Sequence, residues 1–232
     1  MKHPLPPRPA LGVHRGLAYA LFLPPTEPRA GVVILHGAGS AKESHFDFAR
    51  KAAAHDMAAI AFDARGHGRT GGEFGPGAVD DVLAICALLR ERVPRIALRG
   101  SSMGGFLALE AAAADGDADA VVAICPAAPD MLLRGLRAER FEFPADRAAL
   151  EPWLEGLDQE AAVASLAPRT ALLLLHARGD EQVPYTNSER LHEVAGEPKR
   201  FLLMPGGHHR SIQHDEELQA EALRFVERAL ER

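Results

Sequence analysis

Residues 98–106 read LRGSSMGGF and decide the fold. An apolar run, 95–98, leads into this stretch, and a run of small residues with helical character, 104–114, leads out of it. The chain therefore turns from a strand into a helix at Ser102, in the G-x-S-x-G pattern of a nucleophile elbow. Such a turn is so tight that the positions two residues before and after the serine have room only for glycine.

Apolar runs and helix-period runs alternate along the rest of the chain. Strands are predicted at 17–23, 31–35, 58–62, 95–98, 120–125, 170–175 and 199–204, and helices at 43–55, 79–92, 104–114, 188–195 and 215–230. The strand runs are continuously apolar, which is typical of a parallel sheet covered on both faces. We therefore expect an α/β fold, a mostly parallel sheet sandwiched by helices, in a single domain spanning 1–232. The strands at 17–23 and 31–35 are expected to form a hairpin or a neighbouring pair.

Residues 126–169 interrupt the alternation, because no strand pattern occurs there. Short apolar clusters mixed with charges and prolines predict two or three short helices, a small cap insertion at about 130–168. Insertions of this length often cover an active site. Its aromatic residues Phe141, Phe143 and Trp153 are candidates for substrate binding, and the alternative that they only pack the insertion onto the sheet stays open.

The composition excludes several classes of partner. The net charge is -6 and the arginines are interspersed with acids, so neither nucleic acid nor a membrane is expected to bind. No signal peptide and no run of eighteen apolar residues is apparent, and the two cysteines, Cys86 and Cys125, lie in apolar runs as reduced thiols would. We expect a cytoplasmic protein. The oligomeric state is not readable from the sequence.

A nucleophilic serine requires a general base and an acid that orients it. Asp180 follows the strand predicted at 170–175, and His208 and His209 follow the last strand. The tetrahedral intermediate also requires two backbone N–H donors. The N–H of Met103 is one candidate, and the loop HGAGS at 36–40 supplies the other, which we assign to Ala38 with Gly37 as the alternative.

Five motifs occur in order: HGAG at 36–39, DARGHG at 63–68, the elbow at Ser102, DEQVP at 180–184 and GGHH at 206–209. In this set the chain resembles the α/β-hydrolase superfamily, in particular small esterases and serine-aminopeptidase-like hydrolases. The resemblance implies that Ser102, Asp180 and His209 are catalytic and that Ala38 and Met103 form the oxyanion hole. The register G-x-x-H selects His209 over His208. Many members carry a further strand before the first pair, and the proline-rich start of this chain shows no pattern for one.

The remaining motif residues are expected to be structural. His36 should form hydrogen bonds beneath the oxyanion loop. His67 and Asp63 should hold the glycine-rich loop together, and Asp63 and Arg65 are able to pair. The sequence thus predicts a serine hydrolase that cleaves a small-molecule carboxylic ester through an acyl-enzyme, without a metal or an organic cofactor. Two alternatives remain: the same triad acting as a thioesterase, peptidase or acyltransferase, and a ligand-binding protein on this fold with slow turnover.

Overall fold

One sheet of eight strands organises the computed structural model, which describes residues 8–115 and 117–231. Its strands are β1 (Ala10–His14), β2 (Leu17–Phe22), β3 (Ala30–Leu35), β4 (Met57–Phe62), β5 (Ile96–Ser101), β6 (Ala120–Ile124), β7 (Ala171–Ala177) and β8 (Lys199–Met204). Their order across the sheet is β1-β2-β4-β3-β5-β6-β7-β8, in which only the β1/β2 and β2/β4 pairs are antiparallel. The predicted mostly parallel α/β fold is confirmed.

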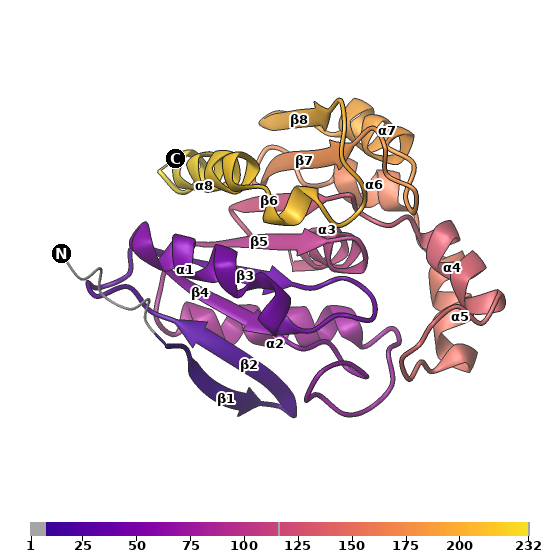
Figure 1. Cartoon of the computed structure of the whole chain (residues 1–232), viewed down its shortest axis with the longest axis horizontal. Helices are drawn as coiled ribbons and strands as arrows, with labels where there is room; N and C mark the ends of the chain where they lie inside the picture. Colours follow the sequence, from indigo (N-terminus) through magenta and orange to yellow (C-terminus); the bar gives the residue numbers. More distant parts are fainter. Residues whose placement is uncertain (1–7, 116, 232) are drawn as a thin grey trace.

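Helices cover both faces of the sheet (Figure 1). Helices α2 (Ala78–Arg90), α3 (Met103–Asp115) and α7 (Thr186–Val194) pack on one face, and α1 (Phe46–Ala54) and α8 (Glu216–Leu230) pack on the other. In β5, Leu98 belongs to the core on the α3 side and Ala97 to the core on the α8 side. Because both faces are buried, the central strands are apolar at successive positions, as the sequence indicated.

The prediction that the strands at 17–23 and 31–35 pair is wrong, because β4 lies between β2 and β3. All six residues of β4 are buried, so this strand needs a neighbour on each side. It pairs in parallel with β3 and antiparallel with β2, where Tyr19 lies opposite Phe62. The proline-rich turn after β2 therefore leads across a neighbouring strand and does not close a hairpin.

Strand β1 was missed by the sequence analysis. It forms the edge of the sheet, where Leu11 is 62% and Val13 is 70% exposed. The strand is held by its backbone ladder with β2, from Ala10 opposite Leu21 to His14 opposite Leu17. An edge strand without a buried face leaves almost no apolar pattern in the sequence.

Three short helices lie in the stretch predicted as a cap: α4 (Pro129–Arg137), α5 (Arg147–Glu155) and α6 (Gln159–Ala164). Asp146 and Asp158 begin α5 and α6, and their side chains accept hydrogen bonds from the N–H groups of Ala149 and Ala161. Helices α4 and α5 extend beyond the carboxyl ends of the parallel strands (Figure 1). Within the described residues, no helix combines the length and apolar character needed to cross a bilayer.

Candidate active site

Ser102 occupies the sharp turn between β5 and α3, as predicted. Its φ angle is +54°, a conformation that costs energy for a residue with a side chain. The surrounding backbone holds it there: the Ser102 N–H donates to Ile124 O at 2.8 Å, and the Ser102 carbonyl accepts from the N–H groups of Phe106 at 3.0 Å and Ala127 at 3.1 Å. Hydrogen bonds from β6, α3 and the loop after β6 thus stabilise the unfavourable backbone conformation of Ser102.

The two glycines of the elbow are required by close backbone approach. A Cβ atom on Gly100 would lie 2.0 Å from the carbonyl oxygen of Gly104. A Cβ atom on Gly104 would lie 2.5 Å from the carbonyl oxygens of Leu35 and His36. The second contact brings the end of β3, and with it the following loop, directly against the elbow.

The loop after β3 presents backbone to the serine. A Cβ atom on Gly37 would lie 3.4 Å from Ser102 Cβ, and Ala38 is exposed. In the described chain, the N–H of Ala38 donates to no carbonyl or side chain, and Met103 is the first residue of α3, where helical N–H groups lack a partner. These two N–H groups are therefore free to donate to a substrate oxygen.

His36 supports this loop through two hydrogen bonds. Its Nδ1–H donates to Gly37 O at 2.8 Å, and its Nε2 accepts from the N–H of Ala64 at 3.0 Å. Burial lowers the pKa of His36 to about 4, so the ring is neutral at physiological pH. The expectation of a structural histidine under the loop is confirmed.

Asp63 and Arg65 do not pair with each other, contrary to the prediction. Asp63 is fully buried, and its carboxylate accepts from Lys42 Nζ at 2.6 Å and from the backbone N–H groups of Lys42 and Arg69. Arg65 Nε instead donates to Asp81 on α2 at 2.6 Å. A buried carboxylate and the nearest ammonium group satisfy each other first, and Arg65 is long enough to reach another helix.

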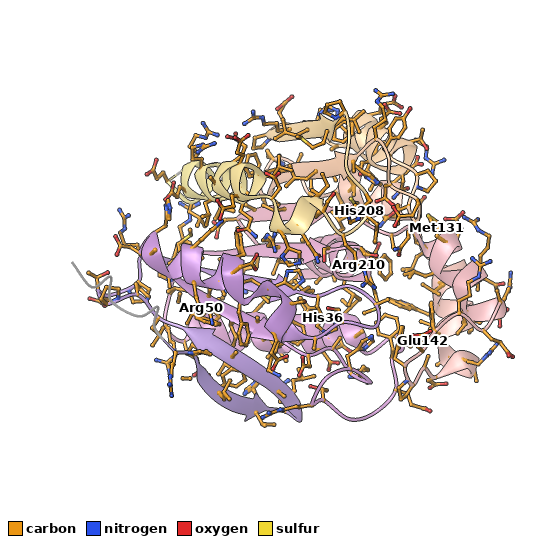
Figure 2. The ribbon with its side chains drawn as sticks, in the orientation of Figure 1. His36, Arg50, Met131, Glu142, His208 and Arg210 are labelled. Carbon is orange, nitrogen blue, oxygen red and sulfur yellow. The ribbon has the colours of Figure 1, made fainter. Side chains whose placement is uncertain are left out.

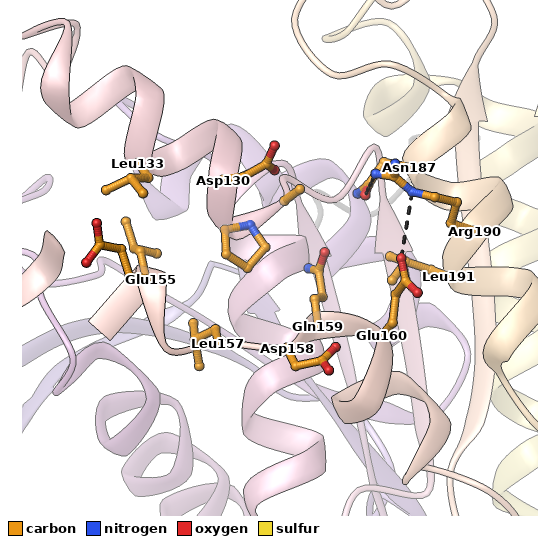
Figure 3. A pocket seen from close by; sticks show the side chains of 13 residues that line it. Asp130, Leu133, Glu155, Leu157, Asp158, Gln159, Glu160, Asn187, Arg190 and Leu191 are labelled. Atoms are coloured by element: carbon orange, nitrogen blue, oxygen red, sulfur yellow. Dashed lines mark hydrogen bonds and ion pairs between the residues drawn. The ribbon is translucent and has the colours of Figure 1, made fainter. Parts of the chain in front are cut away.

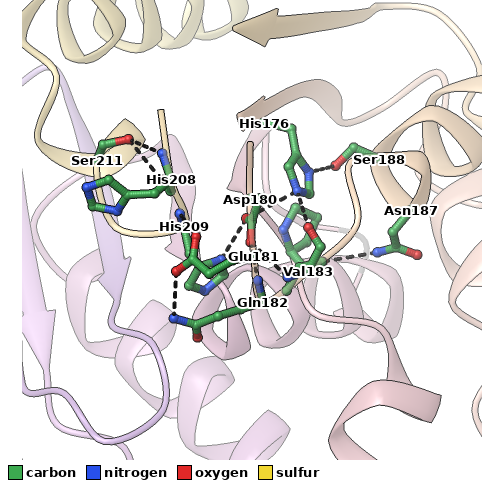
Figure 4. A network of polar contacts seen from close by, with 11 residues as sticks. His176, Asp180, Glu181, Gln182, Val183, Asn187, Ser188, His208, His209 and Ser211 are labelled. Carbon is green, nitrogen blue, oxygen red and sulfur yellow. Dashed lines mark hydrogen bonds and ion pairs between the residues drawn. The ribbon is translucent and has the colours of Figure 1, made fainter. Parts of the chain in front are cut away.

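Asp180 and His209 meet at the carboxyl ends of β7 and β8 (Figure 4). His209 Nδ1 donates to Asp180 Oδ2 at 2.7 Å, and the other carboxylate oxygen accepts from the N–H groups of Gln182 and Val183, both at 2.8 Å. The Asp180 side chain is fully buried. Burial acts to raise the pKa of Asp180, but the hydrogen bonds from His176, His209 and Val183 outweigh it and hold that pKa well below its ordinary value.

A second histidine contacts the same carboxylate. His176 Nε2 lies 3.3 Å from Asp180 Oδ2 and 3.0 Å from Val183 O, and its Nδ1 lies 2.7 Å from Ser188 Oγ (Figure 4). Both neighbours of Nε2 are acceptors, so the proton resides on Nε2 and Ser188 donates to Nδ1. His176 was expected to be structural, and here it fixes the orientation of the acid.

His208 and His209 have different surroundings. His209 is 8% exposed and contacts Asp180, whereas His208 is exposed and only its backbone is fixed, by Ser211 Oγ at 2.9 Å. Cys125 at the end of β6 lies close by: potential ligand atoms of Cys125, Asp180 and His209 are within 4.8 Å of one another. Burial raises the pKa of the Cys125 thiol, so the uncharged thiol is a poor metal ligand. The position of Cys125 at a strand end is a signal that the sequence analysis did not use.

Ser102 and His209 line one cavity of about 310 Å³, the serine cavity, together with Ala38, Gln182, Arg210 and Gln213. In the view of Figure 2, Arg210 lies between His36 and His208. The residues described here form no hydrogen bond between the side chains of Ser102 and His209. Such bonds are often long in unliganded enzymes and shorten when substrate is bound.

The aromatic residues of the insertion lie elsewhere. The Phe141 and Phe143 rings stack with centroids 4.8 Å apart, Phe143 lies 4.1 Å from the ring of His67, and Trp153 contacts Phe106 edge-on at 5.6 Å. Within the described chain, none of the three aromatic side chains predicted to bind substrate lines the serine cavity. They join the insertion to the glycine-rich loop and to α3.

A larger cavity of about 540 Å³, the insertion cavity, lies between the insertion and α7 (Figure 3). Its apolar lining includes Leu133, Leu154, Leu157 and Leu191, and its carboxylates are Asp130, Glu155, Asp158 and Glu160. Arg190 extends from α7 to within 3.8 Å of Glu160. Gln159 Nε2 donates to Ala127 O and Asn187 Nδ2 donates to Pro126 O, both at 3.0 Å, so the loop between the cavities is held from this side.

A family model described as the alpha/beta hydrolase family matches residues 32–231. The chain belongs to the alpha/beta hydrolase family. Among curated proteins, this hydrolase is 27% identical over 209 residues to the uncharacterized protein YfhR of Escherichia coli O157:H7, covering 87% of this chain and 71% of that one. It spans 63% of YfhR from strain K12. It is 26% identical to the monoacylglycerol lipase of Mycolicibacterium smegmatis, covering 87% and 88% of the two chains.

Solved structures show the same fold at low identity. Est1E from Butyrivibrio proteoclasticus, solved with ferulic acid, superposes with a TM-score of 0.73 at 20% identity and covers 93% of this hydrolase and 94% of its own chain. The monoacylglycerol lipase of Paleococcus ferrophilus has a TM-score of 0.71 at 22% identity and covers 93% and 98% of the two chains. The predicted membership of the hydrolase superfamily is confirmed.

Proposed function

We propose that this hydrolase is a serine esterase in which Ser102, His209 and Asp180 form the catalytic triad. The observation that carries the proposal is that His209, hydrogen-bonded to the buried Asp180, and Ser102, at a strained turn, line the same cavity. The family membership and the names of the similar proteins, an esterase and two lipases, support an ester as substrate.

The reaction follows from the chemistry of these groups. Ser102 Oγ attacks the ester carbonyl carbon while His209 Nε2 takes the hydroxyl proton, and the N–H groups of Ala38 and Met103 donate to the resulting oxyanion. The intermediate collapses as His209 returns the proton to the departing alcohol, which leaves an acyl group on Ser102. A water molecule, deprotonated by His209, then attacks this acyl group and releases the acid.

The test compares Ser102→Ala with Ser165→Ala, a serine variant at the exposed end of α6, on 4-nitrophenyl esters, a thioester and an anilide. Ser102→Ala should lower kcat on the best ester by on the order of 10⁴- to 10⁶-fold, as removal of the nucleophile does in a dissected triad. Ser165→Ala should behave as the wild type. Retention of more than about a tenth of the wild-type rate by Ser102→Ala would refute Ser102 as the nucleophile. Faster turnover of the thioester or the anilide than of the ester would refute an ester as the substrate class.

A further inference from the structure

Most residues that line the serine cavity have polar side chains. Besides Ser102 and His209 these are Ser40, Ser44, Ser101, Gln182, Arg210, Gln213 and His214, and the remaining lining residues are Gly37, Ala38 and Gly39 of the oxyanion loop. Ser40 Oγ donates to Ser44 Oγ at 2.9 Å, which in turn donates to Ala41 O at 2.7 Å, so Ser40 keeps acceptor capacity. Among the described residues, this wall offers a long alkyl chain no large apolar side chain to pack against.

The far side of this wall is rigidly supported. Arg99 on β5 is buried, lies 4.0 Å above the Phe48 ring and donates from Nη2 to Gln213 O at 2.9 Å. Gln219 on α8 donates to the same oxygen at 2.9 Å. Gln213, next to His214 in the cavity wall, is therefore held by two side chains from the sheet and from α8.

Arg210 is exposed and lines the serine cavity, and no Asp or Glu side chain of the described residues does. The exposed carboxylate of Glu181 lies outside this lining, where it accepts from the N–H of His209 at 3.2 Å. Arg210 also forms no ion pair within the described part of the chain, whereas His214, the neighbouring group, is matched by Asp47 at 3.0 Å. In a protein with 32 acidic residues and a net charge of -6, a cavity with an unpaired arginine and no carboxylate is a specific local arrangement.

We propose that the natural ester carries a carboxylate, which Arg210 binds while the ester carbonyl lies at Ser102. This inference rests on the proposed function and adds the class of substrate. A guanidinium group binds a carboxylate through two parallel hydrogen bonds, and the hydroxyl and amide groups of the wall can solvate the short chain between carboxylate and ester. The favoured substrates are therefore short half-esters of dicarboxylic acids or esters of hydroxy acids, and long-chain neutral esters are disfavoured.

Two matched pairs of substrates place the carboxylate on either side of the ester bond. On the acyl side, 4-nitrophenyl hemiglutarate is compared with 4-nitrophenyl pentanoate. On the alcohol side, the butyrate of 3-hydroxybenzoate is compared with phenyl butyrate. The wild type should prefer the anionic member of at least one pair by about tenfold in kcat/KM, the contribution of a hydrogen bond to a charged group.

Arg210→Gln tests whether this preference depends on the guanidinium group. The variant should reduce the anionic-to-neutral ratio to about one, mainly through KM, and Arg210→Lys should recover part of it. Arg224→Gln, which removes an arginine from the outer face of α8, is the matched control and should keep the wild-type ratio.

Equal rates on both members of both pairs, or a preference that survives in Arg210→Gln, would overturn the proposal while ester turnover through Ser102 remained established. If the wild type turned over none of the esters, the proposed function itself would be refuted. The two failures are therefore distinguishable.

Discussion

The serine cavity and the insertion cavity differ in chemistry and in construction. The first is formed by loops at strand ends and holds Arg210 and no carboxylate, whereas the second is formed by helices and holds four carboxylates beside a floor of leucines. The loop at Pro126 and Ala127 contacts residues of both cavities: the Ala127 N–H donates to Ser102 O, and Gln159 of the insertion cavity donates to Ala127 O. The proposed triad therefore lies in the smaller cavity, although the insertion encloses the larger one.

The largest expected effect identifies which histidine at the serine cavity is the general base. His209→Ala should lower kcat by on the order of 10⁴- to 10⁶-fold, because no other histidine of the described residues contacts Asp180 and also lines the serine cavity. His208→Ala should change kcat by less than about twofold, as an exposed side chain without a contact would. Steady-state kinetics on one activated ester checks both, and equal losses in the two variants would contradict the assignment.

The next effect concerns stability beside the insertion cavity. Glu110 on α3 is buried with one oxygen unpartnered, and burial, aided by Asp158, raises its pKa to about 7 from 4.5. The folded state therefore favours the protonated form, so stability is full below the ordinary pKa of a glutamate and is lost as pH rises toward 7. Glu110→Gln removes this loss, and it should stabilise the protein at pH 8 by about 3 kcal/mol and progressively less as pH falls to 5.

Urea unfolding of Glu110→Gln and wild type at pH 5 and pH 8 measures this difference. Glu217→Gln, an exposed glutamate in the first turn of α8, serves as the control and should show no comparable pH dependence. A gain in stability that is the same at both pH values would mean that Glu110 does not titrate between them.

A smaller effect is expected from His176, which shares Asp180 with His209. His176→Leu removes an N–H that stabilises the Asp180 carboxylate, so this carboxylate becomes more basic. A more basic Asp180 stabilises the protonated form of His209 more strongly. The acid limb of the kcat/KM profile should shift to higher pH, by about half a unit to one unit. Ser188→Ala should cause a smaller shift in the same direction, because Ser188 only fixes the tautomer of His176.

His176→Gln retains a donor at the position of Nε2 and should restore the acid limb. A profile measured between pH 5 and 9 separates this role from simple packing. A variant that unfolds at lower temperature but keeps the wild-type limb would assign His176 to packing alone.

The smallest effect is expected from the aromatic side chains of the insertion. Phe143→Ala and Trp153→Ala should leave the preference between short and long acyl chains within about twofold of the wild type, because neither ring lines the serine cavity and both pack on His67 and Phe106. The measurement is the ratio of kcat/KM for 4-nitrophenyl acetate and octanoate. A change of about fourfold or more, the contribution of one buried methylene group, would return these rings to the acyl-binding site.

The fold was largely predictable because its signals are local. The buried strands are uniformly apolar, and Ser102, Asp180 and His209 each follow a strand within a short motif. Parallel strands bring their carboxyl ends to one edge of the sheet, so residues 78 positions apart in sequence, Ser102 and Asp180, could be expected at one site. The exposed edge strand β1 lacks such a signal, since its side chains are not buried.

The polar wall and the ion pairs were not predictable. Ser44, Arg210 and Gln213 come from different segments and follow no motif, so only the folded chain places them around one cavity. Likewise, Asp63 and Arg65 are two residues apart yet bind Lys42 and Asp81, because their partners are set by tertiary packing. The sequence shows which residues are charged, but their local spacing does not predict which opposite charge is nearest in the fold.

The most direct test of Ser102 as the nucleophile is to label the protein with a fluorophosphonate and to locate the adduct by peptide mass spectrometry. One adduct is expected, on the peptide containing Ser102, with loss of ester turnover in proportion to labelling, and no adduct is expected on Ser102→Ala. An adduct on another residue, or a fully labelled Ser102 in an enzyme that still turns over ester at the wild-type rate, would contradict this assignment.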